Sequence, residues 1–167
     1  MDNWQFCFLT DRYYIDFPDN NLMKNKEAVN GVLIDRPCFF AFRDKENQDI
    51  MWLVPISSQY DKYKKIHDKN VEKYGFCTTI RFGTVIGTMA AFLIQNMCPA
   101  IDKYIREIYV DKNNVPIAID NRVIQDVISS ASEVLARVKR GSKLIFPDIA
   151  KIKQILLEEL GENGKRL

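Results

Sequence analysis

The pattern of hydrophobic and polar positions predicts strands in the first two thirds of the chain. Residues 4–9, WQFCFL, are rich in aromatic side chains and favour a strand. Two apolar runs, residues 38–42 and 50–56, are separated by the polar stretch RDKENQD and predict a β-hairpin at the centre of a sheet. Residues 77–94 predict two or three further strands with turn-like interruptions at Gly83 and Gly87. The aromatic residues of the hairpin are expected in the core.

Apolar residues at helical spacing predict three helices. The first covers residues 59–74 and carries lysines on its polar side. The second, near residues 121–140, has the clearest periodicity, with Asp120 or Asn121 as its cap. A third is predicted near residues 147–160. Because strands come mostly first and helices mostly last, the order favours an antiparallel α+β fold over a doubly wound parallel sheet.

The remaining segments are polar. Residues 16–31 contain a proline, several asparagines and Gly31, and they predict a long loop. Residues 161–167, GENGKRL, predict a polar, frayed tail. No repeat or low-complexity tract divides the chain, so residues 1–160 are expected to form a single domain.

Composition narrows the function classes. The 167 residues are 47% hydrophobic and 28% charged, which is typical of a soluble globular domain. Lys and Arg number 24 against 22 Asp and Glu, so the net charge of +2 gives no general sign of nucleic-acid binding, and any such function must rest on local clusters. No apolar stretch reaches the roughly 20 residues of a membrane span, and no secretory signal is seen, so the expected location is the cytosol.

Cysteine and histidine usage argues against a metal centre. The four cysteines form no CxxC motif, and His67 is the only histidine, so neither zinc nor another cofactor is expected. We expect the cysteines to be reduced core residues. A ribonuclease that uses one histidine as acid and another as base is excluded for a single subunit.

The segment PISSQYDKYKK, residues 55–65, holds the most suggestive chemistry. Ser57 and Ser58 stand at a strand-to-helix junction, where hydroxyls and free N–H groups suit one phosphate. Nearby lysines can add positive charge, and Tyr60 and Tyr63 can stack on bases. The alternative is that one serine caps the helix, the lysines are solvated and the tyrosines pack inward.

Four stretches resemble a known toxin family: YYIDFPDNNLMKNKE (13–27), RPCFFAF (36–42), WLVPISSQYDKYKKI (52–66) and AFLIQNMCPAIDKYI (91–105). They are similar to the endoribonuclease toxins of type III toxin–antitoxin systems, the ToxN/AbiQ group, with the closest likeness to its CptN branch. The resemblance implies a compact antiparallel SH3-like barrel, similar to the MazF/Kid toxins, with added helices. It also implies sequence-preferring RNA cleavage without metal. The implied partner is a small, repeat-derived, pseudoknot-like antitoxin RNA, which the toxin processes and which holds it in a closed protein–RNA assembly.

The resemblance also assigns roles to residues. It places the family's hydroxyl pair on Ser57 and Ser58, its active-site tyrosine on Tyr13 with Tyr14 as the alternative, and its basic residue on Arg36. The family lysine falls on Tyr60 here, so Lys62 or Lys64 would have to substitute. The implied reaction is attack of a ribose 2′-OH on phosphorus, which leaves a 2′,3′-cyclic phosphate and a 5′-OH. Arg36 and the serines suit charge stabilisation, Tyr13 suits proton donation, and the general base is open.

A wider RNA-binding surface is expected from scattered aromatic and basic residues: Tyr14, Lys24, Lys26, Tyr60, Lys64, Lys65, Lys69, Arg137, Lys139, Arg140 and Lys143. Each basic run taken alone is also typical of a solvated face. Two other functions are therefore kept beside the nuclease. One is a non-catalytic RNA-binding protein that uses the same surface, and the other is a small interaction domain without RNA.

Overall fold

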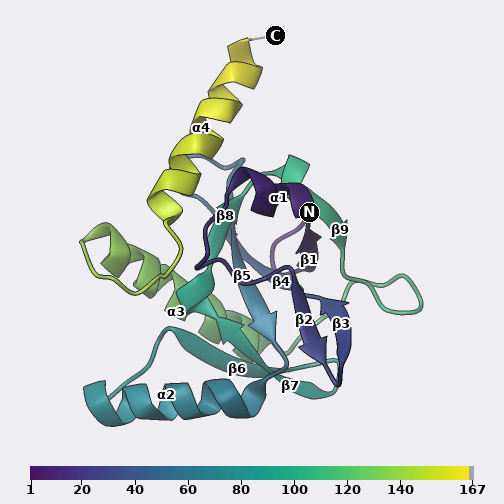
Figure 1. The fold of residues 1–167 in the computed structure, drawn as a ribbon, viewed down its shortest axis with the longest axis vertical. Helices are drawn as coiled ribbons and strands as arrows, with labels where there is room; N and C mark the ends of the chain where they lie inside the picture. The colour runs from purple at the N-terminus through teal and green to yellow at the C-terminus, as the bar shows by residue number, and fades with distance from the viewer. Residues whose placement is uncertain (166–167) are drawn as a thin grey trace.

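The computed structural model describes residues 1–165, with side chains through Gly161, and it is a mixed α+β fold. An antiparallel sheet forms its centre, and helices surround the sheet (Figure 1). The sheet strands are β1 (Phe6–Leu9), β4 (Cys38–Arg43), β5 (Met51–Ser57), β6 (Ile80–Val85), β7 (Thr88–Leu93), β8 (Cys98–Ala100) and β9 (Ile105–Ile108). A separate hairpin contains β2 (Lys26–Val29) and β3 (Val32–Asp35). The helices are α1 (Asp11–Asp16), α2 (Tyr60–Tyr74), α3 (Asn121–Lys139) and α4 (Ile149–Lys165), with 3-10 turns at Ile94–Asn96 and Asp102–Tyr104.

Strand β5 is the organising element of the sheet. The strand order is β6-β7-β5-β4-β1-β9, and β8 also pairs with β5. The first half of β5 pairs with β8, for example Leu53 with Cys98, whereas its end pairs with β7 through Ile56 and Ser57. Its other edge pairs with β4 along the strand. The predicted hairpin therefore lies at the centre of the sheet, and the predicted antiparallel α+β class is confirmed.

Alternation along β4 and β5 separates two buried layers. One layer joins the sheet to α3 and includes Phe39, Trp52, Val54, Val127, Ala131 and Val134. The opposite layer joins the sheet to α1 and α4 and includes Tyr13, Phe40, Leu53, Ile152 and Leu156. Helix α2 packs over β6 and β7 through a smaller cluster of Tyr63, Ile80, Ala91 and Leu93. Successive side chains of a strand point to opposite faces, so neighbours on β5 belong to different layers.

Both predicted C-terminal helices are present. Asp120 caps α3, and its side chain accepts a hydrogen bond from the Arg122 amide. Asp148 accepts from the Lys151 amide at 3.2 Å and so caps the start of α4. Helix α4 continues through residues 161–165, where a frayed tail was predicted. Its two glycines there, Gly161 and Gly164, each cost only about 1 kcal/mol and do not end the helix. Residues 166–167 of that tail lie outside the described residues.

The prediction of a loop over residues 16–31 is wrong for its last part. Strands β2 and β3 form a hairpin around Asn30 and Gly31, whose φ angles are 50° and 77°. Two consecutive residues with positive φ are the signature of a tight type I′ turn, for which Asn-Gly is a preferred sequence. The prediction of a turn at Gly83 is also wrong, because Gly83 lies inside β6. There, an added Cβ would approach Val123 of α3 to 2.5 Å.

The predicted core residues are confirmed. All four cysteines are buried and unpaired. Phe39, Phe40 and Trp52 are fully buried, and Phe42 packs against the α3 layer. None of the helices described here has the length and apolar character needed to cross a membrane.

Candidate functional site

Ser57 is the last residue of β5, and its side chain is buried. Its hydroxyl donates a hydrogen bond to Oε1 of Glu27, with an O–O distance of 2.5 Å. The same hydroxyl oxygen accepts from the Gln59 amide at 3.2 Å. The position of Ser57 is therefore fixed by a carboxylate on the β2–β3 hairpin, a residue 30 positions earlier in the chain.

Glu27 lies on β2 and is also buried. Its Oε1 accepts two hydrogen bonds, from the Ser57 hydroxyl and from Nε2 of Gln59 at 3.1 Å. Its Oε2 has only longer contacts, to the Ser58 amide at 3.4 Å and the Ser58 hydroxyl at 3.5 Å. Oε2 is therefore the carboxylate oxygen next to the exposed Ser58, although the Glu27 side chain itself is only 5% exposed.

Arg36 supplies the countercharge for this carboxylate. Its Nη1 lies 3.7 Å from Oε2 of Glu27, and both side chains are buried. The guanidinium also donates to the main-chain oxygens of Lys24 and Ile56, each at 2.9 Å. A buried carboxylate needs such a partner, since an unpaired charge in the interior costs several kcal/mol. Arg36 therefore holds Glu27 in place and ties the β2–β3 hairpin to β5.

The N-terminus of α2 opens beside the two serines. Gln59 is the N-cap residue, and no side chain caps the helix. The Ser57 hydroxyl oxygen accepts a hydrogen bond from the Gln59 amide, and the Ser58 carbonyl oxygen accepts one from the Tyr60 amide. Free N–H groups in the first helical turn carry partial positive charge and favour an anion. The serine pair therefore lies next to a helix end that favours anion binding. The negative charge of Asp61, in the same turn, acts against this.

The structure places Tyr13 in the core, and its expected catalytic role stays a prediction. Its side chain has no exposed surface, and its hydroxyl donates to the Pro99 carbonyl at 2.8 Å. Burial raises the pKa of Tyr13 well above its ordinary value. Tyr14 is half-buried beside it, and burial raises its pKa although the charge of Arg36 acts in the opposite direction. The Tyr13 hydroxyl is therefore engaged by the main chain within the core.

The predicted lysines lie on α2. Lys62 is exposed in the first turn, with Nζ 5.2 Å from the centre of the Tyr63 ring. Lys64 is paired with Asp68 at 2.8 Å. Lys65 and Lys69 are exposed. Tyr60 is only partly exposed, because its ring packs edge-on against Phe82.

The other predicted RNA-binding residues form two separate groups. Lys24 and Lys26 are exposed at the β2 hairpin, near Glu27, and Lys26 lies 3.8 Å from Asp35. Arg137, Lys139, Arg140 and Lys143 are at the C-terminal end of α3 or just beyond it. Of the predicted residues, the structure thus joins Ser57, Ser58 and Arg36 through Glu27, and it places the α3 group on a different helix.

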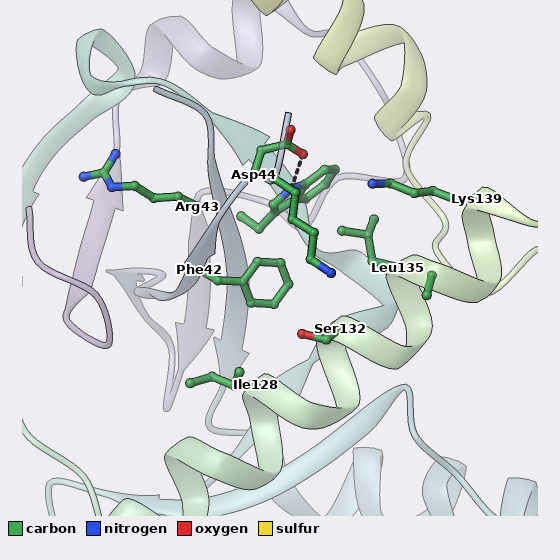
Figure 2. A pocket seen from close by; sticks show the side chains of 10 residues that line it. Phe42, Arg43, Asp44, Ile128, Ser132, Leu135 and Lys139 are labelled. Carbon is green, nitrogen blue, oxygen red and sulfur yellow. Dashed lines mark hydrogen bonds between the residues drawn. The ribbon is translucent and has the colours of Figure 1, made fainter. Parts of the chain in front are cut away.

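A cavity of about 280 Å³ lies between the β4–β5 hairpin and α3 (Figure 2). In it, Asp44 accepts from Nε1 of Trp52 at 2.9 Å, and Lys139 and Leu135 face it from α3. Trp52 and Ser57 are five positions apart on one strand, so their side chains point to opposite faces of the sheet. This cavity is therefore separate from the serines.

Glu27 is the site residue that sequence reasoning missed. The Asn30-Gly31 turn was the available signal, because it predicts a hairpin that would bring residues 26–29 against residues 32–35. Among the described residues, no group of three or more His, Cys, Asp and Glu side chains is arranged to hold a metal ion.

Comparisons with known proteins bear mainly on the fold. No family model matches the chain, and no curated protein matches it by sequence. An antiparallel sheet with flanking helices of this kind occurs in a solved structure, that of AbiQ. AbiQ is described as a lactococcal anti-phage endoribonuclease belonging to the type III toxin–antitoxin system. The TM-score is 0.58 at 17% sequence identity, and the match covers 95% of this chain and 99% of that chain. The chain therefore shares the fold of AbiQ over nearly its whole length.

Proposed function

We propose that this chain is an endoribonuclease toxin of a type III toxin–antitoxin system. The observation that carries the proposal is the cluster of Glu27, Ser57 and Ser58 beside the open N-terminus of α2. The fold shared with AbiQ and the sequence resemblance to the ToxN/AbiQ toxins, closest to the CptN branch, support it. The cluster unites a proton acceptor, an exposed hydroxyl and a positive helix end in one place.

The proposed reaction is attack of a ribose 2′-OH on the adjacent phosphorus. It requires removal of the 2′-OH proton, which we assign to Oε2 of Glu27, the carboxylate oxygen with only long contacts. Ser57 and Arg36 fix the orientation of that carboxylate. Arg36 acts in this scheme as a positioning residue, because its donors are engaged by Glu27 and by main-chain oxygens. The products are a 2′,3′-cyclic phosphate and a 5′-OH.

The charge that develops on the phosphoryl oxygens needs donors that are already in place. The exposed hydroxyl of Ser58 and the N–H groups of the first turn of α2 are such donors. Lys62, in the same turn, replaces the family lysine, adds positive charge and protonates the departing 5′-oxygen. The scheme uses no metal, because the nucleophile is the ribose hydroxyl itself.

We further propose that an RNA partner restrains the toxin. By analogy with the family resemblance, this partner is a small repeat-derived antitoxin RNA, which the protein processes and binds in a closed assembly in the cytosol. The lysines in or just before β2 and in the first turn of α2 (Lys24, Lys26 and Lys62), together with Lys65 and Lys69 further along α2, supply a surface for its phosphates. The same surface would bind cellular RNA substrates once the antitoxin is lost.

One observation favours the second candidate, a non-catalytic RNA-binding protein. The Ser57 hydroxyl is buried and its hydrogen bonds are made within the protein, as in a purely structural network. In that case the cluster only anchors the β2–β3 hairpin to β5. The basic surface would then bind RNA without cutting it.

Cleavage in the presence of EDTA separates the two functions. Protein freed of bound RNA is incubated with mixed cellular RNA, and wild type is compared with the Ser57→Ala/Ser58→Ala double variant. Discrete cuts with 5′-OH and cyclic-phosphate ends, absent with the variant, are the expected result. Binding without any cuts would reject the nuclease and leave the RNA-binding protein.

A further inference from the structure

Two exposed aromatic rings mark the C-terminal end of α2, far from the serines. The side chains of Tyr74 and Phe76 are 60% and 50% exposed. They line a cavity of about 210 Å³, here called the Tyr74–Phe76 cavity, together with Asn70, Cys77, Thr78, Thr79, Arg137 and Leu144. Large apolar rings are normally buried, so two neighbouring exposed rings beside a hollow indicate a contact surface.

Cations accompany both rings. The guanidinium carbon of Arg137 lies 5.3 Å from the centre of the Phe76 ring, and Nζ of Lys73 lies 5.0 Å from that of Tyr74. Arg137 is held in place by Glu133 at 2.8 Å. An aromatic platform with an adjacent arginine stacks nucleobases of single-stranded nucleic acid regardless of their identity. Side chains with donors and acceptors, such as Asn70 and Thr78, border the cavity and can bond to a base edge.

A stripe of lysines runs along α2, between the end near the serines and the end near this cavity. Lys62, Lys65, Lys69 and Lys73 follow one another at intervals of three or four residues along α2 and are all exposed. This spacing places them on one face of the helix. Within the described part of the chain, no ion pair within 4 Å engages any of the four, whereas Asp68 on the helix is paired with Lys64.

The length of α2 sets the distance that this path covers. Its 15 residues span about 22 Å at 1.5 Å per residue. A stacked strand rises about 3.4 Å per nucleotide, so about six nucleotides fit along the helix, and fewer if the strand is extended. Binding sites for single strands commonly cover four or more nucleotides.

We infer that the Tyr74–Phe76 cavity is a base-stacking subsite for single-stranded RNA. The backbone of that RNA follows the lysine stripe from the serine cluster to the cavity. This inference rests on the proposed function, since it takes the serine cluster as the place of cleavage. The subsite would bind a base several nucleotides from the scissile phosphate. Substrates too short to reach it would bind more weakly, which sets a minimum substrate length.

Binding of uncleavable RNA tests the inference. Fluorescein-labelled 2′-O-methyl oligonucleotides of random sequence, two and eight nucleotides long, are titrated with the full chain at low salt, and Kd is measured by anisotropy. Phe76→Ala is compared with Phe76→Trp, which keeps a stacking ring, and with Phe146→Ala. Phe146 is the matched control because it is 55% exposed and lies outside the cavity. Thermal melting verifies that each variant is folded.

We expect Phe76→Ala to raise the Kd of the octanucleotide about 5- to 150-fold, the range for loss of one stacked base. Phe76→Trp should bring the octanucleotide Kd back to the wild-type value, and Phe146→Ala should leave it unchanged. The Kd of the dinucleotide should be the same for wild type and Phe76→Ala. Equal octanucleotide affinity for Phe76→Ala and wild type would overturn the subsite. If wild type still cuts RNA in EDTA, that result leaves the proposed function standing. Neither cutting nor binding by wild type would reject both.

Discussion

The Ser57 hydroxyl and the Glu27 carboxylate are joined by a 2.5 Å hydrogen bond between the end of β5 and the β2–β3 hairpin. Both side chains are buried, and Arg36 neutralises the carboxylate from the other side. Ser58 is the exposed member of the cluster, within 3.5 Å of the second carboxylate oxygen. This arrangement gives the two adjacent serines different roles, which single substitutions can separate.

Ser58→Ala should lower RNA cleavage about 100-fold or more, because it removes a preorganised donor, and it should leave stability unchanged since the side chain is exposed. Ser57→Ala should also lower cleavage but cost about 1–2 kcal/mol of stability, because Glu27 loses a buried hydrogen bond. Cleavage rates and urea midpoints of the two single variants provide the comparison. Equal stability loss in both would mean that the serines are not distinguished in this way.

Glu27→Gln tests the carboxylate as proton acceptor. The amide is nearly isosteric but cannot take a proton, so cleavage should fall about 100- to 10,000-fold while RNA binding is retained. The buried Arg36 loses its partner, and a drop in melting temperature should accompany the change. Glu107→Gln, at an exposed position, is the control. Normal cleavage by folded Glu27→Gln would exclude the assigned role.

Tyr13→Phe distinguishes a core tyrosine from a catalytic one. The substitution removes the hydrogen bond to the Pro99 carbonyl and should cost about 1 kcal/mol of stability. Because the ring is buried, the rate of RNA cleavage should stay at the wild-type value. A large loss of cleavage by a Tyr13→Phe protein of nearly normal stability would instead support a catalytic role for Tyr13.

Asp44→Asn should make the free energy of unfolding depend less on pH in the acidic range. Burial alone would raise the pKa of Asp44. Hydrogen bonds from the Trp52 indole, the Lys153 ammonium and the Glu46 amide outweigh burial and lower the pKa below its ordinary value. A lowered folded-state pKa contributes stability above the unfolded pKa of about 3.9, and this stability is lost as pH falls through the folded value.

The wild type should therefore be more stable than Asp44→Asn at pH 7, by about 1–3 kcal/mol, because the buried ion pair with Lys153 is lost in the variant. The difference should shrink as the pH approaches 3. Urea midpoints measured from pH 7 down to pH 3 reveal the trend. A difference that stays constant over this range would contradict the assigned cause.

Local patterns in the sequence determined most of the fold. The central hairpin, α2, α3 and the start of α4 follow from periodicity, capping and turn residues, which act between neighbours in the chain. The serine pair at the strand-to-helix junction also followed from its local context. The β2–β3 hairpin was missed although Asn30-Gly31 is a local signal, because the surrounding residues are polar enough to suggest a loop.

Only the tertiary structure decided which residues join the serines. Glu27 reaches Ser57 across 30 positions, and Arg36 fixes it through bonds to two distant main-chain oxygens. Tyr13 was expected at the same place, but sheet and helix packing buries its ring. Contacts between residues so far apart in the chain depend on how several elements pack together. A buried charge is then tolerated only where the packing gives it a partner, as Arg36 does for Glu27. The sequence by itself places a residue on an element but does not place that element against its neighbours.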